Sequence, residues 1–227
     1  VPEQCPGTTF GAAPRGPTHP PQKNGAYVRT ILFDMFGVIA RTQSTEARAA
    51  LERASGVEGE RFWDAYWGVR HAYDRGDLDG PAYWSAVGER LDVHFDRHRV
   101  DELIALDLAS WARLDEEMVE HVFALSENGV RLGLLSNIPY ELADLFAERF
   151  PHVLALFPVV GLSCHIGSAK PEPEAFTWCL RRLEVPAERV LFVDDNERNV
   201  LAARDLGLAG HHFSSLEGLR AAMTGAP

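Results

Sequence analysis

The sequence predicts an α/β fold with a Rossmann-like core, in which helices cover a parallel sheet, and with an inserted helical domain. Short apolar runs recur along the chain, and each is followed by polar residues and then by a helical pattern. This alternation is typical of a parallel sheet covered by helices. The stretch between the first and second runs is longer than one crossover requires and holds several helical patterns. The length of 227 residues suits one full domain with a smaller insertion.

Residues 1–26 are expected to form a Pro/Gly-rich tail outside the fold. They contain six of the 14 prolines and few large apolar groups, so they bury too little surface to offset the entropy lost on ordering. The core is predicted to comprise residues 27–41 and 113–227, and the helical insertion residues 42–112.

Four apolar runs are predicted to be strands, at 28–33, 130–135, 157–160 and 190–193. Their Val, Leu and Phe content is typical of strands that are buried on both faces of a parallel sheet. Helices are predicted within the insertion at 45–55, 59–75, 81–91 and 100–108. In the core, a helix over 199–206 ends at Gly207, a natural C-cap, and another begins at Pro173, since proline suits a first helical turn.

Composition and charge exclude several classes of protein. With 33 acidic and 22 basic residues, and a net charge of -11, the chain lacks the basic character of nucleic-acid-binding proteins. No apolar stretch reaches the roughly 18 residues that indicate a membrane helix. Three cysteines without a CxxC pair indicate neither a disulfide framework nor a zinc site, and no secretory signal pattern is found. We therefore expect a cytoplasmic protein with no nucleic-acid or membrane partner.

Four motifs carry polar or charged side chains that could take part in catalysis. The functional groups of a parallel sheet lie at the carboxyl ends of its strands, and these motifs follow predicted strands or precede a predicted helix. The side chains are Asp34 in ILFDMFGV, Ser136 and Asn137 in LGLLSNIPY, Lys170 in SAKPEPEAF, and Asp194 and Asp195 in VLFVDDNERN. Each residue alone has an ordinary interpretation as a helix cap or a surface group. Their coincidence favours one common site.

The four motifs, in this order and at these spacings, resemble those of the haloacid dehalogenase superfamily, which is dominated by phosphatases. The resemblance extends from Val28 to about Phe213, and the gap between the first two motifs leaves room for the helical cap of subfamily I. The segments 73–76 (YDRG) and 83–84 (YW) look like the cap of bacterial sugar-1-phosphate phosphatases. The resemblance implies the same α/β core with an inserted cap.

The resemblance also implies an enzyme in which Asp34 attacks phosphorus and forms an aspartyl-phosphate, so that one difficult displacement becomes two easier ones. It implies Mg²⁺ as the cofactor, because a carboxylate approaches a phosphate dianion only when charge is compensated. The implied metal ligands are Asp34, the backbone carbonyl of Phe36, Asp194 and Asp195. The implied substrate is a small phosphorylated metabolite, such as a sugar phosphate.

Four other residues are candidates for contact with the phosphate or substrate. Ser136, counted as catalytic, and the backbone N–H of Asn137 would bind phosphoryl oxygens at a helix N-terminus, where the dipole favours anions. Lys170, also counted as catalytic, would neutralise the remaining charge and keep Asp34 ionised. Arg41, at the hinge of the insertion, is a candidate substrate-binding residue, as is Asn137.

One position departs from the family pattern. Phosphatases of this family usually carry Asp-x-Asp in the first motif, and the second Asp protonates the leaving alkoxide and then activates water; here that position is Phe36. Positioned acid–base groups contribute about 10²–10⁴ in rate. Sugar-1-phosphate phosphatases of similar pattern also lack this aspartate, so the favoured interpretation is a phosphatase whose substrate has a good leaving group or whose acid comes from elsewhere. His165 is one candidate for that acid, although a loop histidine more often has a structural role.

Two alternatives remain open. A 2-haloacid dehalogenase releases halide without a proton and carries an aromatic residue at this position, which fits Phe36. Dehalogenases, however, have serines in place of Asp194 and Asp195 and use no metal. A chain that has lost catalysis would bind a phosphorylated metabolite or a partner without turnover.

The aromatic-rich stretch at 62–73 is expected to take part in substrate choice through a minority of its residues. Phe62 and Tyr66, and likewise Trp63 and Trp67, are spaced as i,i+4 pairs of a helix. That spacing more often serves core packing than ligand binding.

Overall fold

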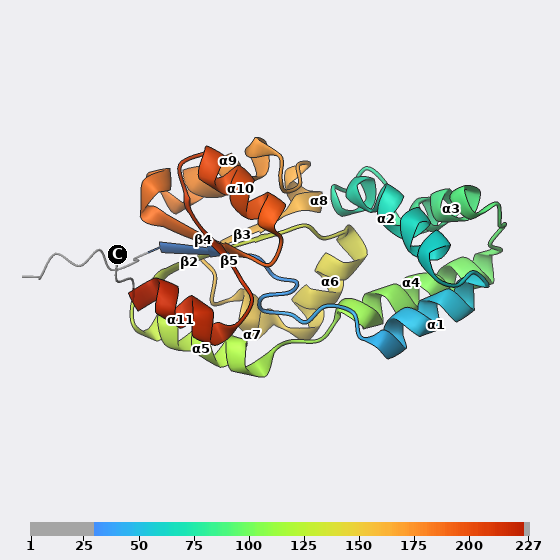
Figure 1. The fold of residues 1–227 in the computed structure, drawn as a ribbon, viewed down its shortest axis with the longest axis horizontal. Coiled ribbons are helices and arrows are strands. Elements are labelled where there is room, and N and C mark those ends of the chain that lie inside the picture. The colour runs from blue at the N-terminus through green and yellow to red at the C-terminus, as the bar shows by residue number, and fades with distance from the viewer. Residues whose placement is uncertain (1–29, 225–227) are drawn as a thin grey trace, which may run out of the picture.

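The computed structural model describes residues 30–224 and consists of a sheet-centred body and a helical insertion (Figure 1). The predicted tail at 1–26 lies outside the described residues, as do the first two residues of the first predicted strand. None of the helices within residues 30–224 has the length and apolar character that crossing a membrane demands.

The sheet has five parallel strands in the order β3-β2-β1-β4-β5, which confirms the predicted α/β class. The strands are β1 (Thr30–Phe33), β2 (Arg131–Ser136), β3 (Val159–Leu162), β4 (Val190–Asp194) and β5 (Ala209–His212). The three central strands β2, β1 and β4 bury nearly every residue, as their unbroken apolar sequences indicate.

Two predictions about the sheet were wrong. The third strand begins two residues later than expected, because α7 (Pro151–Leu154) and the turn after it, in which the Phe157 N–H donates to the carbonyl of Leu154, occupy those residues. The edge strand β5 was not predicted, since AGHH is short, polar and only half-buried and carries no apolar run.

Helices cover both faces of the sheet (Figure 1). On one face α9 (Pro173–Leu183) and α10 (Glu197–Asp205) pack on Leu32, Leu135 and Phe192. On the other face lie α5 (Glu116–Glu127), α6 (Tyr140–Arg149) and α11 (Leu216–Thr224), which enclose the larger part of the core. The short helices α8 (Ser163–Ile166) and η1 (Ala187–Arg189) complete the body.

The insertion consists of four helices around a core of their own: α1 (Thr45–Ser55), α2 (Glu60–Asp74), α3 (Gly80–Leu91) and α4 (Arg97–Trp111). The ends of these helices follow capping rules. Ser44, Asp79 and Asp96 accept hydrogen bonds from backbone N–H groups in the first turns of α1, α3 and α4. The four helices agree with the predicted ones to within a few residues at each end.

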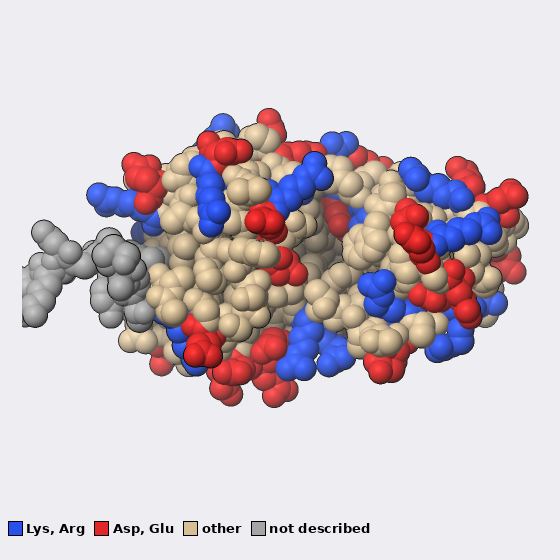
Figure 2. Space-filling model, viewed as in Figure 1, with Lys and Arg blue, Asp and Glu red and all other residues tan. Residues whose placement is uncertain are grey.

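The insertion lies beyond the carboxyl ends of the strands, and Figure 2 shows a hollow between it and the sheet body, with acidic and basic side chains interspersed around it. Several contacts join the two parts, among them an ion pair between Arg75 and Glu172. His71 on α2 lies 2.9 Å from Glu172, the Gly80 N–H donates to Glu141 at 2.5 Å, and the Ser163 hydroxyl donates to the backbone carbonyl of Asp74. The hollow therefore opens directly over the strand ends.

Candidate active site

Asp34 lies at the carboxyl end of β1, the central strand. Its N–H donates to the carbonyl of Val193 at 2.8 Å, so the backbone continues the β1–β4 ladder up to this residue. Its Oδ1 accepts the Met35 N–H at 2.7 Å, and the residue is 7% exposed. Burial, reinforced by Asp194, raises the pKa of Asp34 well above its ordinary value, although Lys170 opposes the shift. A buried carboxylate in this position needs positive charge beside it to stay ionised.

Lys170 joins the first and last motifs of the predicted site. Its Nζ lies 2.6 Å from Oδ1 of Asp34 and 2.8 Å from Oδ2 of Asp194, and all three side chains are buried. Burial alone would lower the pKa of Lys170, but the two carboxylates outweigh it and raise that pKa. Lys170 is therefore a cation held between two carboxylates, and its predicted role of keeping Asp34 ionised remains a prediction.

Asp194 and Asp195 differ in environment although they are adjacent. Asp194 is fully buried, and its Oδ1 accepts the Asn196 N–H at 2.8 Å and Nδ2 of Asn199 at 3.2 Å. The Asp195 side chain is exposed to the hollow. Loss of part of its hydration to the surrounding protein, together with the neighbouring Asp194, raises the pKa of Asp195. Its carboxylate lies so close to Gly37 that a Cβ atom on Gly37 would meet Oδ2 of Asp195 at 2.0 Å.

The three carboxylates suit a hard divalent cation. One oxygen from each of Asp34, Asp194 and Asp195 lies within 4.8 Å of the others. Lys170 alone offsets this charge in the described cluster, which leaves an excess of negative charge and only oxygen donors. Oxygen donors are the ligands that Mg²⁺ prefers. The donor set therefore fits Mg²⁺, and the carbonyl of Phe36 remains a predicted ligand.

Ser136 is the last residue of β2, and Asn137 follows it. Within the described residues, the Ser136 hydroxyl is buried and has no hydrogen-bond partner, which is costly unless a ligand supplies one. The Asn137 side chain holds the Lys170 backbone, donating to its carbonyl and accepting its N–H, both at 2.8 Å. The sequence predicted both residues at a helix N-terminus, but α6 begins only at Tyr140, so Ser136 lies in β2 and Asn137 in the loop between β2 and α6.

A cavity of about 190 Å³ lies between the cluster and the insertion. Its lining comprises Asp34, Phe36, Thr42, Trp67, Arg70, Asp74, Trp111, Asn137, Lys170, Asp195, Asn196 and Asn199. The Phe36 ring packs edge-on against Trp111 and Phe146, at centroid distances of 5.3 and 5.5 Å. An apolar wall thus stands where the family pattern has a second aspartate.

Three residues of this lining come from α2: Trp67, which belongs to the aromatic stretch of which a minority was expected to face the site, and Arg70 and Asp74, which were not predicted. Their i, i+3, i+7 spacing on α2 places them on one face, and this spacing was the signal available in the sequence. Phe62, Trp63 and Tyr66 are buried in the insertion core, as expected, whereas Trp67 is 46% exposed.

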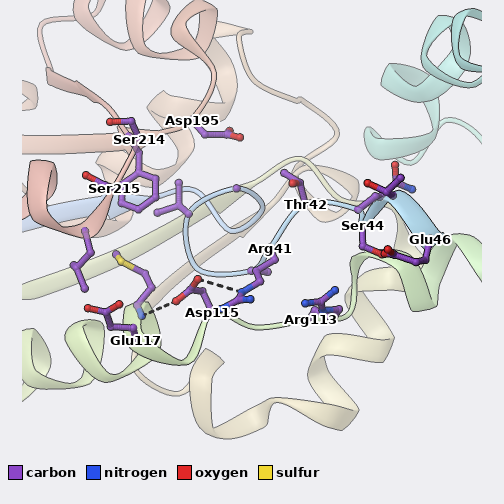
Figure 3. A pocket seen from close by; sticks show the side chains of 18 residues that line it. Arg41, Thr42, Ser44, Glu46, Arg113, Asp115, Glu117, Asp195, Ser214 and Ser215 are labelled. Carbon is purple, nitrogen blue, oxygen red and sulfur yellow. Dashed lines mark hydrogen bonds and ion pairs between the residues drawn. The ribbon is translucent and has the colours of Figure 1, made fainter. Parts of the chain in front are cut away.

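Arg41 lies apart from this cavity. It lines a larger hollow of about 690 Å³, and its Nε pairs with Asp115 at 3.2 Å (Figure 3). The two hollows share Thr42 and Asp195. A substrate contact by Arg41 therefore remains a prediction.

Comparison with known proteins identifies similar chains. The sequence model of the haloacid dehalogenase-like hydrolases matches residues 28–207. Protein CbbY of Cereibacter sphaeroides is 26% identical over 199 residues, which cover 80% of this chain and 82% of that protein. The N-acetylmuramic acid 6-phosphate phosphatase of Pseudomonas aeruginosa is 25% identical over 189 residues, which cover 79% of each chain.

Two solved structures show the same fold. A HAD family enzyme from Bacteroides thetaiotaomicron (bt-2542), in complex with magnesium and inorganic phosphate, has a TM-score of 0.67 and 18% identity, covering 84% of this chain and 98% of that chain. The L-2-haloacid dehalogenase of Xanthobacter autotrophicus has a TM-score of 0.61 and 18% identity, covering 85% of this chain and 80% of that chain.

Proposed function

Because this chain belongs to the haloacid dehalogenase-like hydrolase family, we propose that it is a Mg²⁺-dependent phosphatase of a small phosphorylated metabolite, with Asp34 as the nucleophile. The observation that carries the proposal is the buried Lys170, 2.6 Å from Asp34 and 2.8 Å from Asp194, next to a third carboxylate, Asp195. This arrangement suits a dianionic substrate only together with a divalent cation.

Each residue has a defined part in this reaction. Asp34 attacks phosphorus through a carboxylate oxygen, and Lys170 keeps that carboxylate ionised and oriented. The unpaired hydroxyl of Ser136 donates to a phosphoryl oxygen, and the Asn137 side chain fixes the position of Lys170. Mg²⁺, held by Asp34, Asp194 and Asp195, would supply positive charge against the phosphoryl oxygens.

The similar proteins support this choice of substrate class. One relative is, by its name, a phosphatase of N-acetylmuramic acid 6-phosphate, and a structure of the same fold holds magnesium and inorganic phosphate. A sugar phosphate is therefore the first substrate class to be tested.

A 2-haloacid dehalogenase is the second candidate, because Phe36 forms an aromatic wall over Asp34 and a dehalogenase shares the fold. The acidic cluster disfavours it. A haloacid carries no phosphoryl group whose charge a metal ion would have to offset. Displacement of halide therefore does not explain why three carboxylates surround one lysine.

Turnover of p-nitrophenyl phosphate tests the proposal. We expect hydrolysis that requires Mg²⁺, stops with a chelator and is abolished in Asp34→Asn, whereas Asp101→Asn, on the exposed surface of α4, keeps full activity. Turnover that persists in chelator, or that survives in Asp34→Asn, would contradict it. Chloride release from 2-chloropropionate in chelator would identify the dehalogenase instead.

A further inference from the structure

Hydrolysis of an alkyl phosphate needs a proton donor for the leaving oxygen, and the residue at the usual position cannot supply one. The Phe36 ring is apolar and packs on Trp111 and Phe146. Within the described residues, the titratable side chains that line the cavity are Asp34, Arg70, Asp74, Lys170 and Asp195. Three of these belong to the nucleophile and its charge cluster, and an arginine remains protonated in proteins. Asp74 is the carboxyl group left for proton transfer.

We propose that Asp74, the last residue of α2, is the general acid and base that replaces the aspartate absent at position 36. The inference rests on the proposed phosphatase function and adds a catalytic residue from the helical insertion to it.

The position of Asp74 suits the leaving group. Asp34 attacks from the sheet side of the cavity, and the attacking and leaving oxygens of phosphoryl transfer lie roughly in line. The leaving oxygen therefore points away from β1 towards the insertion, where α2 lies (Figure 1). On α2, Asp74 follows Trp67 and Arg70 along the face that lines the cavity.

Its own contacts hold Asp74 in place and leave one oxygen available. Nε of Arg70 donates to Oδ1 of Asp74 at 2.7 Å, and in the described part of the chain no other hydrogen bond to this carboxyl group occurs. The side chain is 14% exposed. The Ser163 hydroxyl, on α8 of the sheet body, donates to the Asp74 carbonyl, so the end of α2 is tied to the body that carries Asp34.

The surroundings of Asp74 favour its protonated form. Burial raises the pKa of Asp74 above its ordinary value; Arg70 opposes this shift, and Asp107 on α4 reinforces it. Asp107 competes for the same guanidinium, at 3.0 Å from Nη1 of Arg70. The groups that face Asp74 from the neighbouring elements are Arg70, Asp107, His71, Tyr83 and Cys164.

The proton balance closes over two steps. In the first, an Asp34 oxygen bonds to phosphorus, the bond from phosphorus to the alkoxy oxygen breaks, and the Asp74 carboxyl proton moves to that oxygen to give the alcohol. In the second, water attacks the aspartyl-phosphate and loses a proton to the Asp74 carboxylate, while the bond from phosphorus to Asp34 breaks. Phosphate and both starting side chains result.

His165, the candidate suggested by the sequence, does not line the cavity. Its ring lies against Tyr140, with the centroids 5.5 Å apart, on the short helix α8.

A comparison of leaving groups tests the proposal. p-Nitrophenol leaves without a proton, whereas an alkyl alcohol needs one, so Asp74→Asn should lower alkyl phosphate turnover by about 10²–10⁴ and p-nitrophenyl phosphate turnover far less. Asp64→Asn is the matched control, because it removes an exposed carboxylate of the same helix α2 outside the cavity lining, and it should keep the wild-type ratio of alkyl to aryl phosphate turnover. Asp74→Glu should restore part of the alkyl activity. In the wild type, alkyl turnover should fall as the pH rises through the pKa of Asp74.

Equal losses on both substrates in Asp74→Asn would overturn the assignment, as would the same change in the ratio of alkyl to aryl turnover in Asp64→Asn. If circular dichroism shows that Asp74→Asn is unfolded, a series of leaving groups on the wild type decides. When an acid protonates the leaving oxygen, the turnover rate should depend only weakly on the pKa of the leaving group. A steep dependence of the rate on that pKa would overturn the proposal. Absence of any Mg²⁺-dependent turnover of p-nitrophenyl phosphate would instead refute the phosphatase function itself.

Discussion

Gly37 offers a sharp test of the carboxylate cluster, because two separate constraints act on it. Its φ is +79°, where a residue with a side chain costs about 1–2 kcal/mol. A Cβ atom at Gly37 would also lie 2.0 Å from Oδ2 and 2.3 Å from Cγ of Asp195, so the carboxylate must move away. Because Asp195 is exposed, this movement should cost little stability but should remove one oxygen from the proposed metal site.

Gly56 supplies the matched control. It ends α1 with φ of +74°, and a Cβ atom there would meet nothing within 4 Å. Gly37→Ala and Gly56→Ala should therefore both lower the free energy of unfolding by about 1–2 kcal/mol in urea titrations. Only Gly37→Ala should lose Mg²⁺-dependent turnover of p-nitrophenyl phosphate and need a higher Mg²⁺ concentration. Equal activity in the two variants would refute the inferred role of the Gly37–Asp195 contact.

Two further predictions concern buried and partly buried side chains. Ser136→Ala should unfold at the same or a higher urea concentration than the wild type, because an unpaired buried hydroxyl costs about 1–3 kcal/mol. The variant should nevertheless bind inorganic phosphate more weakly. Marked destabilisation would show that the hydroxyl already has a hydrogen-bond partner. Although burial alone would raise the pKa of Glu172, hydrogen bonds from Ser168 and His71 outweigh it and lower that pKa below the ordinary 4.5. The Glu172 carboxylate therefore stabilises the fold fully above about pH 4.5, and its contribution is lost as the pH falls from there. In urea titrations, Glu172→Gln should lose less stability on acidification than the wild type. Identical pH dependence of the two proteins would contradict the contacts of Glu172 with Ser168 and His71.

The apolar runs predicted the central strands because a strand buried on both faces needs apolar side chains on both. The helices of the insertion were predicted because caps such as Ser44 and Asp79 satisfy the first N–H groups locally. The edge strand β5 escaped prediction because its pairing depends on β4 and not on its own four residues. The start of β3 was placed too early because the turn at Phe157 is set by the chain before it.

By itself, the sequence predicted which side chains would take part in the proposed chemistry. Asp34, Ser136 and the acidic pair stand where predicted strands end, at one edge of a parallel sheet, and Lys170 precedes a predicted helix. Only the tertiary structure decided how these groups meet. It placed Lys170 between two carboxylates, directed Arg41 to a separate hollow, and brought Asp74 from the insertion to the cavity over Asp34. The physical reason is that local patterns specify helices and strands, whereas distances between distant residues depend on how whole elements pack.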